Sequence, residues 1–258
     1  MKITVLGAGH MGSWIADELA SDNQVFVFDL DSKRLKNIKK ASTIKDIQEI
    51  KKFKPDMLIN AVSLPKTKEA FSSVMPLLPQ NCILCDLTSV KGDLKKFYQN
   101  SGFKFVSIHP MFGPTFANVE NLSDENIIII KESCQKGKDF FIKLAKKLKL
   151  HIFTYTFSEH DQEVAYSLGV PFSASLVFAS CVCQTNAPGT THRKHMETAK
   201  GVLSEDDYLL SEILFNPQII PQIKKINSKL SYLTHIIKSR NTEIMKEFLD
   251  ELRKNIKL

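Results

Sequence analysis

The stretch KITVLGAGHMG, residues 2–12, decides the fold that the sequence predicts. Its apolar first half is typical of a buried strand, and its second half is a glycine-rich turn with the spacing G-x-G-x-x-G. The next residues, SWIADELA, have helical periodicity, so the turn joins a strand to a helix. In this setting Gly7 permits a tight turn, Gly9 lets a diphosphate come close, and Gly12 lets the helix pack on the strand.

A second strand, QVFVFDLD, ends in Asp29, about 20 residues after the glycines. A carboxylate at this position accepts hydrogen bonds from the ribose of a bound dinucleotide and repels a 2′-phosphate. We therefore expect NAD as the cofactor, although Lys33 and Arg34 follow closely and leave room for NADP. The predicted cofactor site consists of Gly7, Gly9, His10, Met11, Gly12 and Asp29, with Ala61, Val62 and Ser63 after a later strand.

Strand and helix patterns alternate as far as residue 157. The further strands are DMLINAVS, CILCDLTS, FKFVSIH, NIIIIK and HIFTYT. Their nearly continuous apolar character is typical of a parallel sheet covered on both faces. The sequence thus predicts an α/β protein with a Rossmann-type, doubly wound parallel sheet over residues 1–157.

From residue 158 to 258 the patterns are helical only, which predicts an all-helical second domain. The segment from Val164 to Thr191 has no charged residue and is long enough to span a membrane. Because it contains Gly169, Pro171 and Pro188, we expect a buried helix of a soluble protein instead. A helix that is apolar on all sides needs partners on every side, so we predict a homodimer formed through this domain.

Composition narrows the class of partner. Lys and Arg number 35 against 28 Asp and Glu, which gives a net charge of +7. No basic block is interleaved with aromatic residues, so we expect no nucleic-acid binding. The cysteines number five, an odd count, and the first strand leaves no room for a targeting segment, which favours the cytoplasm. Cys82 and Cys85 form a C-x-x-C in an apolar run, where buried side chains are expected rather than a metal site.

Polar residues follow three of the predicted strands. They are Asn60 and Ser63, then Asp86, Thr88 and Ser89, then Ser107 and His109. In a doubly wound sheet, ligands bind beyond the carboxyl ends of the strands. His109 lies at such an end and is followed by Pro110, Gly113 and Pro114, which stiffen the loop. This position suits a general base for a substrate hydroxyl, although a lone histidine can also be structural.

Four motifs occur in order: GAGHMGSW, DLTSVK, HPMFGP and EHDQEVAYSLGVPF. Together they resemble the prephenate dehydrogenase family of tyrosine biosynthesis, over nearly the whole chain. The later stretch APGTTHRKHM…SEDDYLLSEILFNP resembles the short, single-activity members of Bacteroidota-type bacteria.

The resemblance implies oxidative decarboxylation of prephenate to 4-hydroxyphenylpyruvate with NAD. It implies that His109 is the base for the ring hydroxyl, and that Ser89 bonds the same hydroxyl or orients the histidine. Gly113 would lie beside the substrate. Many relatives carry a histidine and an arginine where this chain has Phe172 and Val202.

Because of that departure, we expect Arg193 or Lys194 to bind a substrate carboxylate, within its own chain or across a dimer interface, with an ordinary basic loop as the alternative. The choice between prephenate and arogenate stays open. Another hydroxyacid dehydrogenase, with Lys200 as its base, is a rival interpretation. A dinucleotide-sensing regulator that is not an enzyme is a third, but it would need neither Ser89 nor His109.

Overall fold

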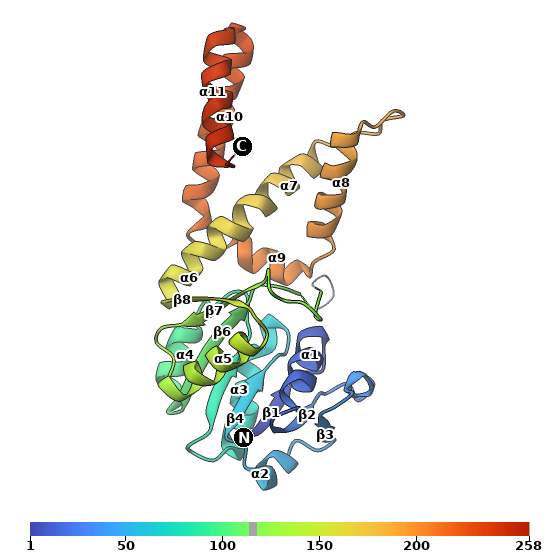
Figure 1. Ribbon diagram of the computed structural model, residues 1–258, viewed down its shortest axis with the longest axis vertical. Coiled ribbons are helices and arrows are strands. Elements are labelled where there is room, and N and C mark those ends of the chain that lie inside the picture. The colour runs from blue at the N-terminus through green and yellow to red at the C-terminus, as the bar shows by residue number, and fades with distance from the viewer. Residues whose placement is uncertain (114–117, 258) are drawn as a thin grey trace. The chain divides into compact units, whose positions relative to one another are not determined.

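The computed structural model describes residues 1–113 and 118–257, which form two compact units (Figure 1). The first comprises Met1–Val164 and Asp206–Glu212, and the second comprises Ala165–Glu205 and Ile213–Leu258. Pro114, one of the residues predicted to stiffen the loop after His109, lies outside the described residues. Each unit is described by itself below.

In the described part of the chain, eight strands form the sheet of the first unit, in the order β3-β2-β1-β4-β5-β6-β7-β8. They are β1 (Lys2–Leu6), β2 (Gln24–Phe28), β3 (Ser42–Thr43), β4 (Met57–Asn60), β5 (Ile83–Asp86), β6 (Lys104–Pro110), β7 (Asn126–Ile130) and β8 (His151–Tyr155). Strand order reverses beside β1, as in a doubly wound fold. The predicted Rossmann-type arrangement is confirmed.

One strand departs from the predicted all-parallel sheet. β7 runs antiparallel to β6 and places Ile128 opposite His109. A parallel neighbour would need a long crossover, usually a helix, and the described residues between β6 and β7 contain none. The sheet is therefore mixed, and β8 returns parallel to β7 after helix α5 (Gln135–Lys147).

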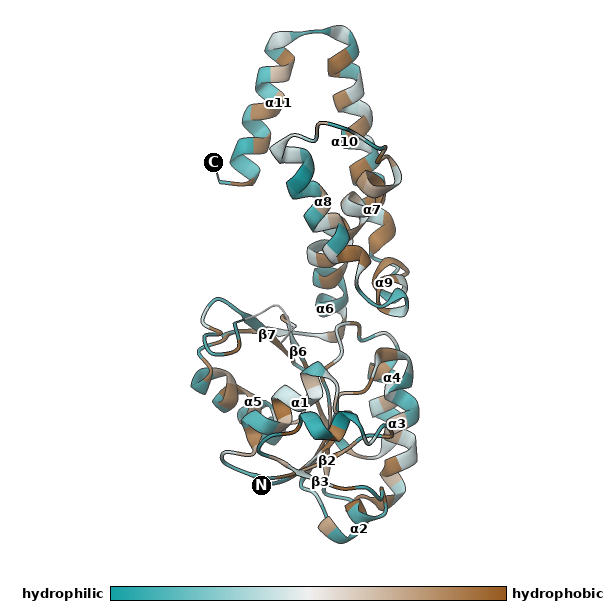
Figure 2. Ribbon diagram, turned by 90° about the vertical axis from the view of Figure 1, so that its right-hand side faces the viewer, coloured by the Kyte–Doolittle hydropathy of each residue, from teal (hydrophilic) through white to brown (hydrophobic). Residues whose placement is uncertain are grey.

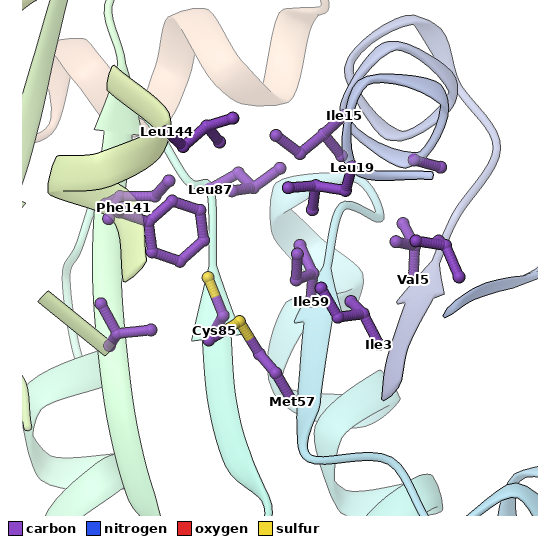
Figure 3. Close-up of a cluster of buried hydrophobic side chains, with 14 of the residues drawn as sticks. Ile3, Val5, Ile15, Leu19, Met57, Ile59, Cys85, Leu87, Phe141 and Leu144 are labelled. Carbon is purple, nitrogen blue, oxygen red and sulfur yellow. The ribbon is translucent and has the colours of Figure 1, made fainter. Parts of the chain in front are cut away.

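Helices cover both faces of this sheet. On one face α1 (His10–Leu19) and α5 pack on a cluster that includes Ile3, Cys85 and Phe141 (Figure 3). On the other face the packing helices are α2 (Glu49–Phe53), α3 (Thr67–Val74), α4 (Leu94–Ser101) and α6 (Phe157–Val164). Short 3₁₀ turns are Arg34–Asn37, Leu64–Lys66 and Met75–Leu77. Cys82 and Cys85 are buried on opposite faces, which confirms their prediction as core residues.

The regular secondary structure in the described residues of the second unit is all helical. A π-helical turn, Ala165–Gly169, leads into α7 (Val170–Ser180), which packs against α8 (Thr190–Leu203). α10 (Ile219–Ser239) and α11 (Thr242–Asn255) form a helical hairpin, and the residues of α9 (Asp207–Leu214) are divided between the two units. Asn241 caps α11 by accepting hydrogen bonds from the amides of Glu243 and Ile244.

The uncharged segment is only partly buried within one chain. In α7 only Ser173 is buried, and Val177 is 57% exposed. Figure 2 shows the concentration of apolar residues along this helix. Over the described residues, no helix is both long enough and apolar enough to cross a membrane. Part of the apolar surface of α7, which includes Val177, is therefore left uncovered by the described residues of the single chain.

Candidate active site

The glycine turn has the backbone geometry that the sequence predicted. Gly7 has a φ of +93°, and its amide donates to the carbonyl of Phe28 over 2.8 Å. A Cβ atom on Gly7 would lie 2.8 Å from the carbonyl oxygen of Ala61. A Cβ atom on Gly12 would lie 2.0 Å from the carbonyl oxygen of Gly7. Glycine is therefore required at both positions, for the turn and for the close packing of α1.

Gly9 differs from the other two glycines. A Cβ atom there would meet nothing within 4 Å, and no side chain caps α1 at this residue. At the start of α1, His10 is exposed and Met11 is half-buried. A helix N-terminus of this kind binds phosphate groups through its amides and dipole. The residues present fit the diphosphate of a dinucleotide.

Asp29 follows β2 and ties two turns together. Its Oδ2 accepts from the amide of Ala8 over 2.7 Å, and its Oδ1 accepts from the amide of Asp31 over 2.8 Å. Arg34 lies 3.8 Å from Asp31, between Nε and Oδ2. The carboxylate predicted to read the ribose therefore also holds the glycine turn, and Arg34 already has an acidic neighbour.

The loop after β4 lies against the glycine turn. The amide of Ala61 donates to the carbonyl of Leu6, and its own backbone borders Gly7. The amide of Val62 donates to Oδ1 of buried Asn60 over 3.3 Å, and Ser63 is exposed. The structure thus brings Ala61 and the glycine turn together, and the cofactor-binding role of Ala61, Val62 and Ser63 stays a prediction.

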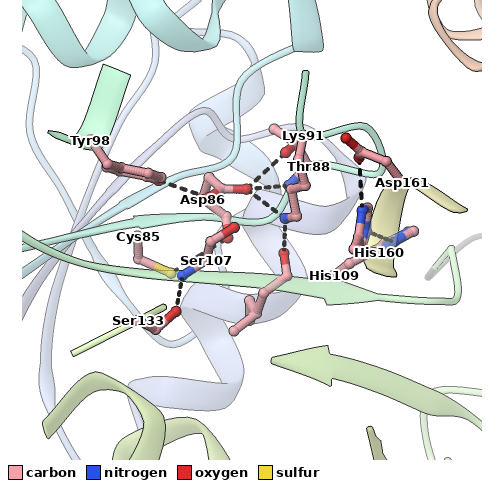
Figure 4. A network of polar contacts seen from close by, with 11 residues as sticks. Cys85, Asp86, Thr88, Lys91, Tyr98, Ser107, His109, Ser133, His160 and Asp161 are labelled. Carbon is pink, nitrogen blue, oxygen red and sulfur yellow. Dashed lines mark hydrogen bonds and ion pairs between the residues drawn. The ribbon is translucent and has the colours of Figure 1, made fainter. Parts of the chain in front are cut away.

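A buried charge network lies between β5 and β6 (Figure 4). Asp86 is fully buried and accepts hydrogen bonds from Thr88, from Nζ of Lys91 over 2.8 Å and from the hydroxyl of Tyr98 over 2.7 Å. Lys91, only 1% exposed, also donates to the carbonyl of Ile108 over 2.7 Å. The network therefore connects the end of β5 to the residue before His109.

This network is a charged pair. Burial alone would raise the pKa of Asp86, but the charge and hydrogen bond of Lys91, with the hydrogen bond from Tyr98, outweigh it and the pKa is lowered. The carboxylate is therefore ionised beside the ammonium group. Lys91 was not singled out from the sequence alone. The one feature that could have indicated its role is its position in DLTSVK, five residues after an aspartate at a strand end.

His109, the penultimate residue of β6, forms a contact with a second histidine. Its Nδ1 lies 3.0 Å from Nε2 of His160, and Nδ1 of His160 lies 3.3 Å from Oδ1 of Asp161. Burial, then the neighbouring His160 and Lys91, hold the pKa of His109 well below its ordinary value of 6.5. Burial also lowers the pKa of His160, although Asp161 opposes this. Both rings are therefore neutral near pH 7.

The hydrogen-bond chain decides the tautomers of these rings. The Asp161 carboxylate accepts, so Nδ1 of His160 carries the hydrogen and its Nε2 is left as an acceptor. Nδ1 of His109 then donates to that Nε2, which leaves Nε2 of His109 with a free lone pair. His109 can therefore accept a proton at Nε2, and the imidazolium so formed would be stabilised through His160 towards Asp161.

A capping box places His160. The amide of Glu159 donates to the hydroxyl of Thr156 over 3.1 Å, and the amide of Thr156 donates to Oε2 of Glu159 over 2.7 Å. Phe157 anchors the same turn in the core. Sequence reasoning noted His160 only as part of a motif, whereas Thr156 and Glu159 could have indicated that it follows directly after a helix start.

Two predicted substrate residues lie near the strand ends of the first unit. Ser89 is half-buried in the turn after β5, and within the described part of the chain no hydrogen bond joins it to His109. Gly113 is exposed. Their roles as substrate contacts stay predictions.

Arg193 and Lys194 lie on α8 in the second unit, and both are exposed. The guanidinium of Arg193 donates to the carbonyl of Pro188 over 2.7 Å and to the hydroxyl of Thr190 over 3.1 Å. A hollow of about 500 Å³ in this unit is lined by residues that include His192, Arg193, Glu197 and Lys200. Over the residues that the structure covers, no cluster of three or more histidine, cysteine or acidic side chains could hold a metal ion.

Comparison with known proteins identifies similar sequences. The family model described as "Prephenate dehydrogenase, nucleotide-binding domain" matches residues 22–151, half of the chain. The match begins after the glycine turn and includes Asp29, Ser89 and His109. A probable arogenate/prephenate dehydrogenase of Methanocaldococcus jannaschii is 24% identical over 96% of this chain. The chain spans 60% of the length of that relative.

Solved structures show the same fold. A prephenate dehydrogenase of A. aeolicus, crystallised with hydroxyphenyl propionate and NAD⁺, has a TM-score of 0.83 at 18% identity and covers 99% of this chain and 96% of its own. Synechocystis arogenate dehydrogenase has a TM-score of 0.78 at 13% identity, covering 100% of this chain and 99% of its own. At these identities the likeness establishes the fold.

Proposed function

We propose, from the premise that the chain belongs to the prephenate dehydrogenase family by its nucleotide-binding domain, that it oxidises and decarboxylates prephenate with NAD. The product would be 4-hydroxyphenylpyruvate. The observation that carries this proposal is the buried chain from His109 through His160 to Asp161, because it leaves a neutral proton acceptor at a strand end.

The cofactor would be held at the other side of this edge of the sheet. The first-turn amides of α1 would bind the diphosphate beside Gly9, and Asp29 would accept hydrogen bonds from the ribose. Ala61, Val62 and Ser63 would border the dinucleotide on the loop after β4. When bound, NAD accepts the hydride from the carbon that carries the substrate hydroxyl.

His109 would take the proton of that hydroxyl at Nε2 as the hydride departs. The carboxylate on the quaternary ring carbon then leaves as carbon dioxide, and its bonding electrons make the ring aromatic. The proton returns to the ring oxygen, which becomes a phenol. Ser89 would bond the same oxygen or orient His109, and Gly113 would lie beside the ring.

The substrate carboxylates would bind to Arg193 or Lys194. The hollow of the second unit supports prephenate over arogenate, because its lining includes Arg193 and Lys200, with His192, against one carboxylate, Glu197. Arogenate carries an ammonium group where prephenate carries a keto group, and this group would meet mostly like charges. The apolar surface of α7 supports a homodimer formed through the same unit.

The test is an assay of NADH or NADPH formation with prephenate and arogenate, each supplied with NAD and with NADP. We expect the highest kcat/KM with prephenate and NAD. His109→Asn should lower kcat by about 10²–10⁴-fold and leave the Kd of NAD unchanged. Failure of the wild type to oxidise either substrate with either cofactor would refute the proposal, and a preference for arogenate would correct the substrate.

A further inference from the structure

The rings of Trp14 and Phe112 meet edge to face, with centroids 5.2 Å apart and planes at 84°. Trp14 lies in α1, one turn after its start at His10, and Phe112 lies three residues after His109. Both rings are half-buried against the same core cluster. The helix that would bind the dinucleotide is thus in direct contact with the segment that follows the proposed base.

The segment after His109 is anchored on two sides. The amide of Met111 donates to the carbonyl of Asn126 over 2.9 Å, and its side chain packs on the core cluster of the opposite sheet face. The side chain of Phe112 packs on the face of the sheet that α1 covers, where it contacts Trp14. The hydrogen bond from Lys91 restrains the residue before His109, and the Trp14–Phe112 contact, together with Met111, restrains the segment after it.

We infer that Trp14 is a positioning residue, which holds His109 at a fixed place relative to the cofactor helix through Phe112. This inference rests on the proposed function of His109. Trp14 acts on the base and not on the diphosphate, because the glycine turn is held separately by the Gly7–Phe28 hydrogen bond and by Asp29. A small displacement of a catalytic group is costly for turnover, whereas cofactor affinity would change little.

The test compares Trp14→Leu with a control variant of matched type. Phe53 forms a stacked pair with Phe26, with centroids 4.1 Å apart, in a hollow lined by residues that include Lys2 and Gln24 at the starts of β1 and β2. Phe53→Leu therefore removes an aromatic contact of the first unit at the amino ends of β1 and β2, whereas the proposed active site lies at the carboxyl ends of the strands. Trp14→Leu should lower kcat about 10-fold with the Kd of NAD within about twofold, and Phe53→Leu should change neither.

Two further variants isolate the contact. Trp14→Phe keeps an aromatic edge and should restore most of the lost turnover. Phe112→Leu should reproduce the loss, and the double variant Trp14→Leu/Phe112→Leu should lose no more than either single one. Because Trp14 is the only tryptophan in the sequence, its fluorescence should also shift to the red in Phe112→Leu. If Trp14→Leu folds poorly, the turnover and NAD affinity of Phe112→Leu are compared with those of Phe53→Leu instead.

A readout without substrate separates this inference from the proposed function. Diethyl pyrocarbonate modifies imidazole, and peptide mass spectrometry reports each histidine, with exposed His10 and His151 as internal references. His109, 4% exposed, should react slowly in the wild type and in Phe53→Leu, and about 10-fold faster in Trp14→Leu. Unchanged reactivity of His109 in Trp14→Leu, or equal losses of turnover in Trp14→Leu and Phe53→Leu, would overturn the inference. A wild type inactive on both substrates would instead refute the proposed function.

Discussion

Lys91 donates from Nζ to the carbonyl oxygen of Ile108, so that a buried ammonium group holds the residue next to His109. The same ammonium group pairs with Asp86 over 2.8 Å. Its charge adds to burial and to His160 in keeping the pKa of His109 low. Placement and protonation of the proposed base are therefore linked in one network.

Lys91→Met should destabilise the protein strongly. It leaves the Asp86 carboxylate buried without its counter-charge, which costs about 3–5 kcal/mol in comparable sites. Urea unfolding followed by circular dichroism measures the change. Asp86→Asn/Lys91→Met removes both charges and should recover part of the loss. A cost below about 1 kcal/mol for Lys91→Met would contradict the interpretation that Lys91 neutralises a buried Asp86 carboxylate.

Asp161→Asn should reduce turnover more than Asp161→Ala does. The asparagine amide can donate to Nδ1 of His160, which reverses both tautomers and leaves Nε2 of His109 carrying a hydrogen. A wrong tautomer at a catalytic histidine costs up to about 10⁴-fold in kcat. Alanine offers no such donor and should cost less. Steady-state kinetics at pH 7.5, with NAD affinity as the control, decides the order, and equal losses would exclude the tautomer chain.

The stability of the protein should fall as pH decreases below about 6.5. In the folded state the pKa values of His109 and His160 are both lowered, so the unfolded chain binds protons first. Stability is therefore complete above the unfolded pKa and is lost towards lower pH, with a limiting slope of about 2.7 kcal/mol per pH unit for two protons. Unfolding free energies between pH 5 and pH 7.5 measure it, and His109→Asn/His160→Phe should have a flatter profile.

The same pKa directions correct one expectation for activity. The sequence alone places the acid limb of kcat/KM, which reports the free enzyme, near the ordinary imidazole pKa, about 6.5. Because burial lowers the pKa of His109, the limb should lie below that value. A pH–rate profile with its limb at or above 6.5 would contradict burial of the base.

Asp29→Ala should weaken NAD binding and shift preference towards NADP. It removes both the acceptor for the ribose and the charge that repels a 2′-phosphate. It also removes the bond to Ala8, so Asp29→Asn is the control, since its side-chain oxygen still accepts from that amide. We expect NADP to gain in both variants, and NAD affinity to fall further in alanine. Titration calorimetry checks this, and a wild type that prefers NADP would reverse the interpretation of Asp29.

The chain should form a homodimer at micromolar concentration. Val177 on α7 and Leu230 and Ile237 on α10 are between 55% and 59% exposed in the single chain. Burying such residues is favourable by about 25 cal/mol per Å² of apolar surface. Analytical ultracentrifugation should detect a dimer, and Val177→Lys should weaken it. A monomeric wild type would disprove the assembly.

Local signals predicted much of the first unit. The glycine turn, the strand ends at Asp29 and His109, and the burial of Cys82 and Cys85 follow from residues close in sequence. The direction of β7 does not, because an isoleucine-rich strand has the same pattern whether its neighbour is parallel or antiparallel.

The contacts around His109 could not be predicted from the sequence for a different reason. His109 and His160 are 51 residues apart, and their pairing depends on how the whole sheet folds. Hydrophobicity predicts an exposed Lys91, and only Asp86 and the Ile108 carbonyl make its burial favourable. The apolar character of α7 predicted that it needs partners on every side, but composition alone does not say which of its faces its own subunit covers.

The hydrogen-bond chain from His109 to Asp161 lies wholly within the first compact unit, while Arg193 and Lys194 lie in the second. Under the proposed function, the residues that transfer the proton and the residues that select the substrate are thus encoded by separate segments of the sequence. Substitutions in the second segment could change which cyclohexadiene acid the enzyme prefers, while the residues that carry out the reaction stay the same. Chimeras that join residues 1–164 to the helical part of a relative with a different substrate would make that modularity usable in engineering.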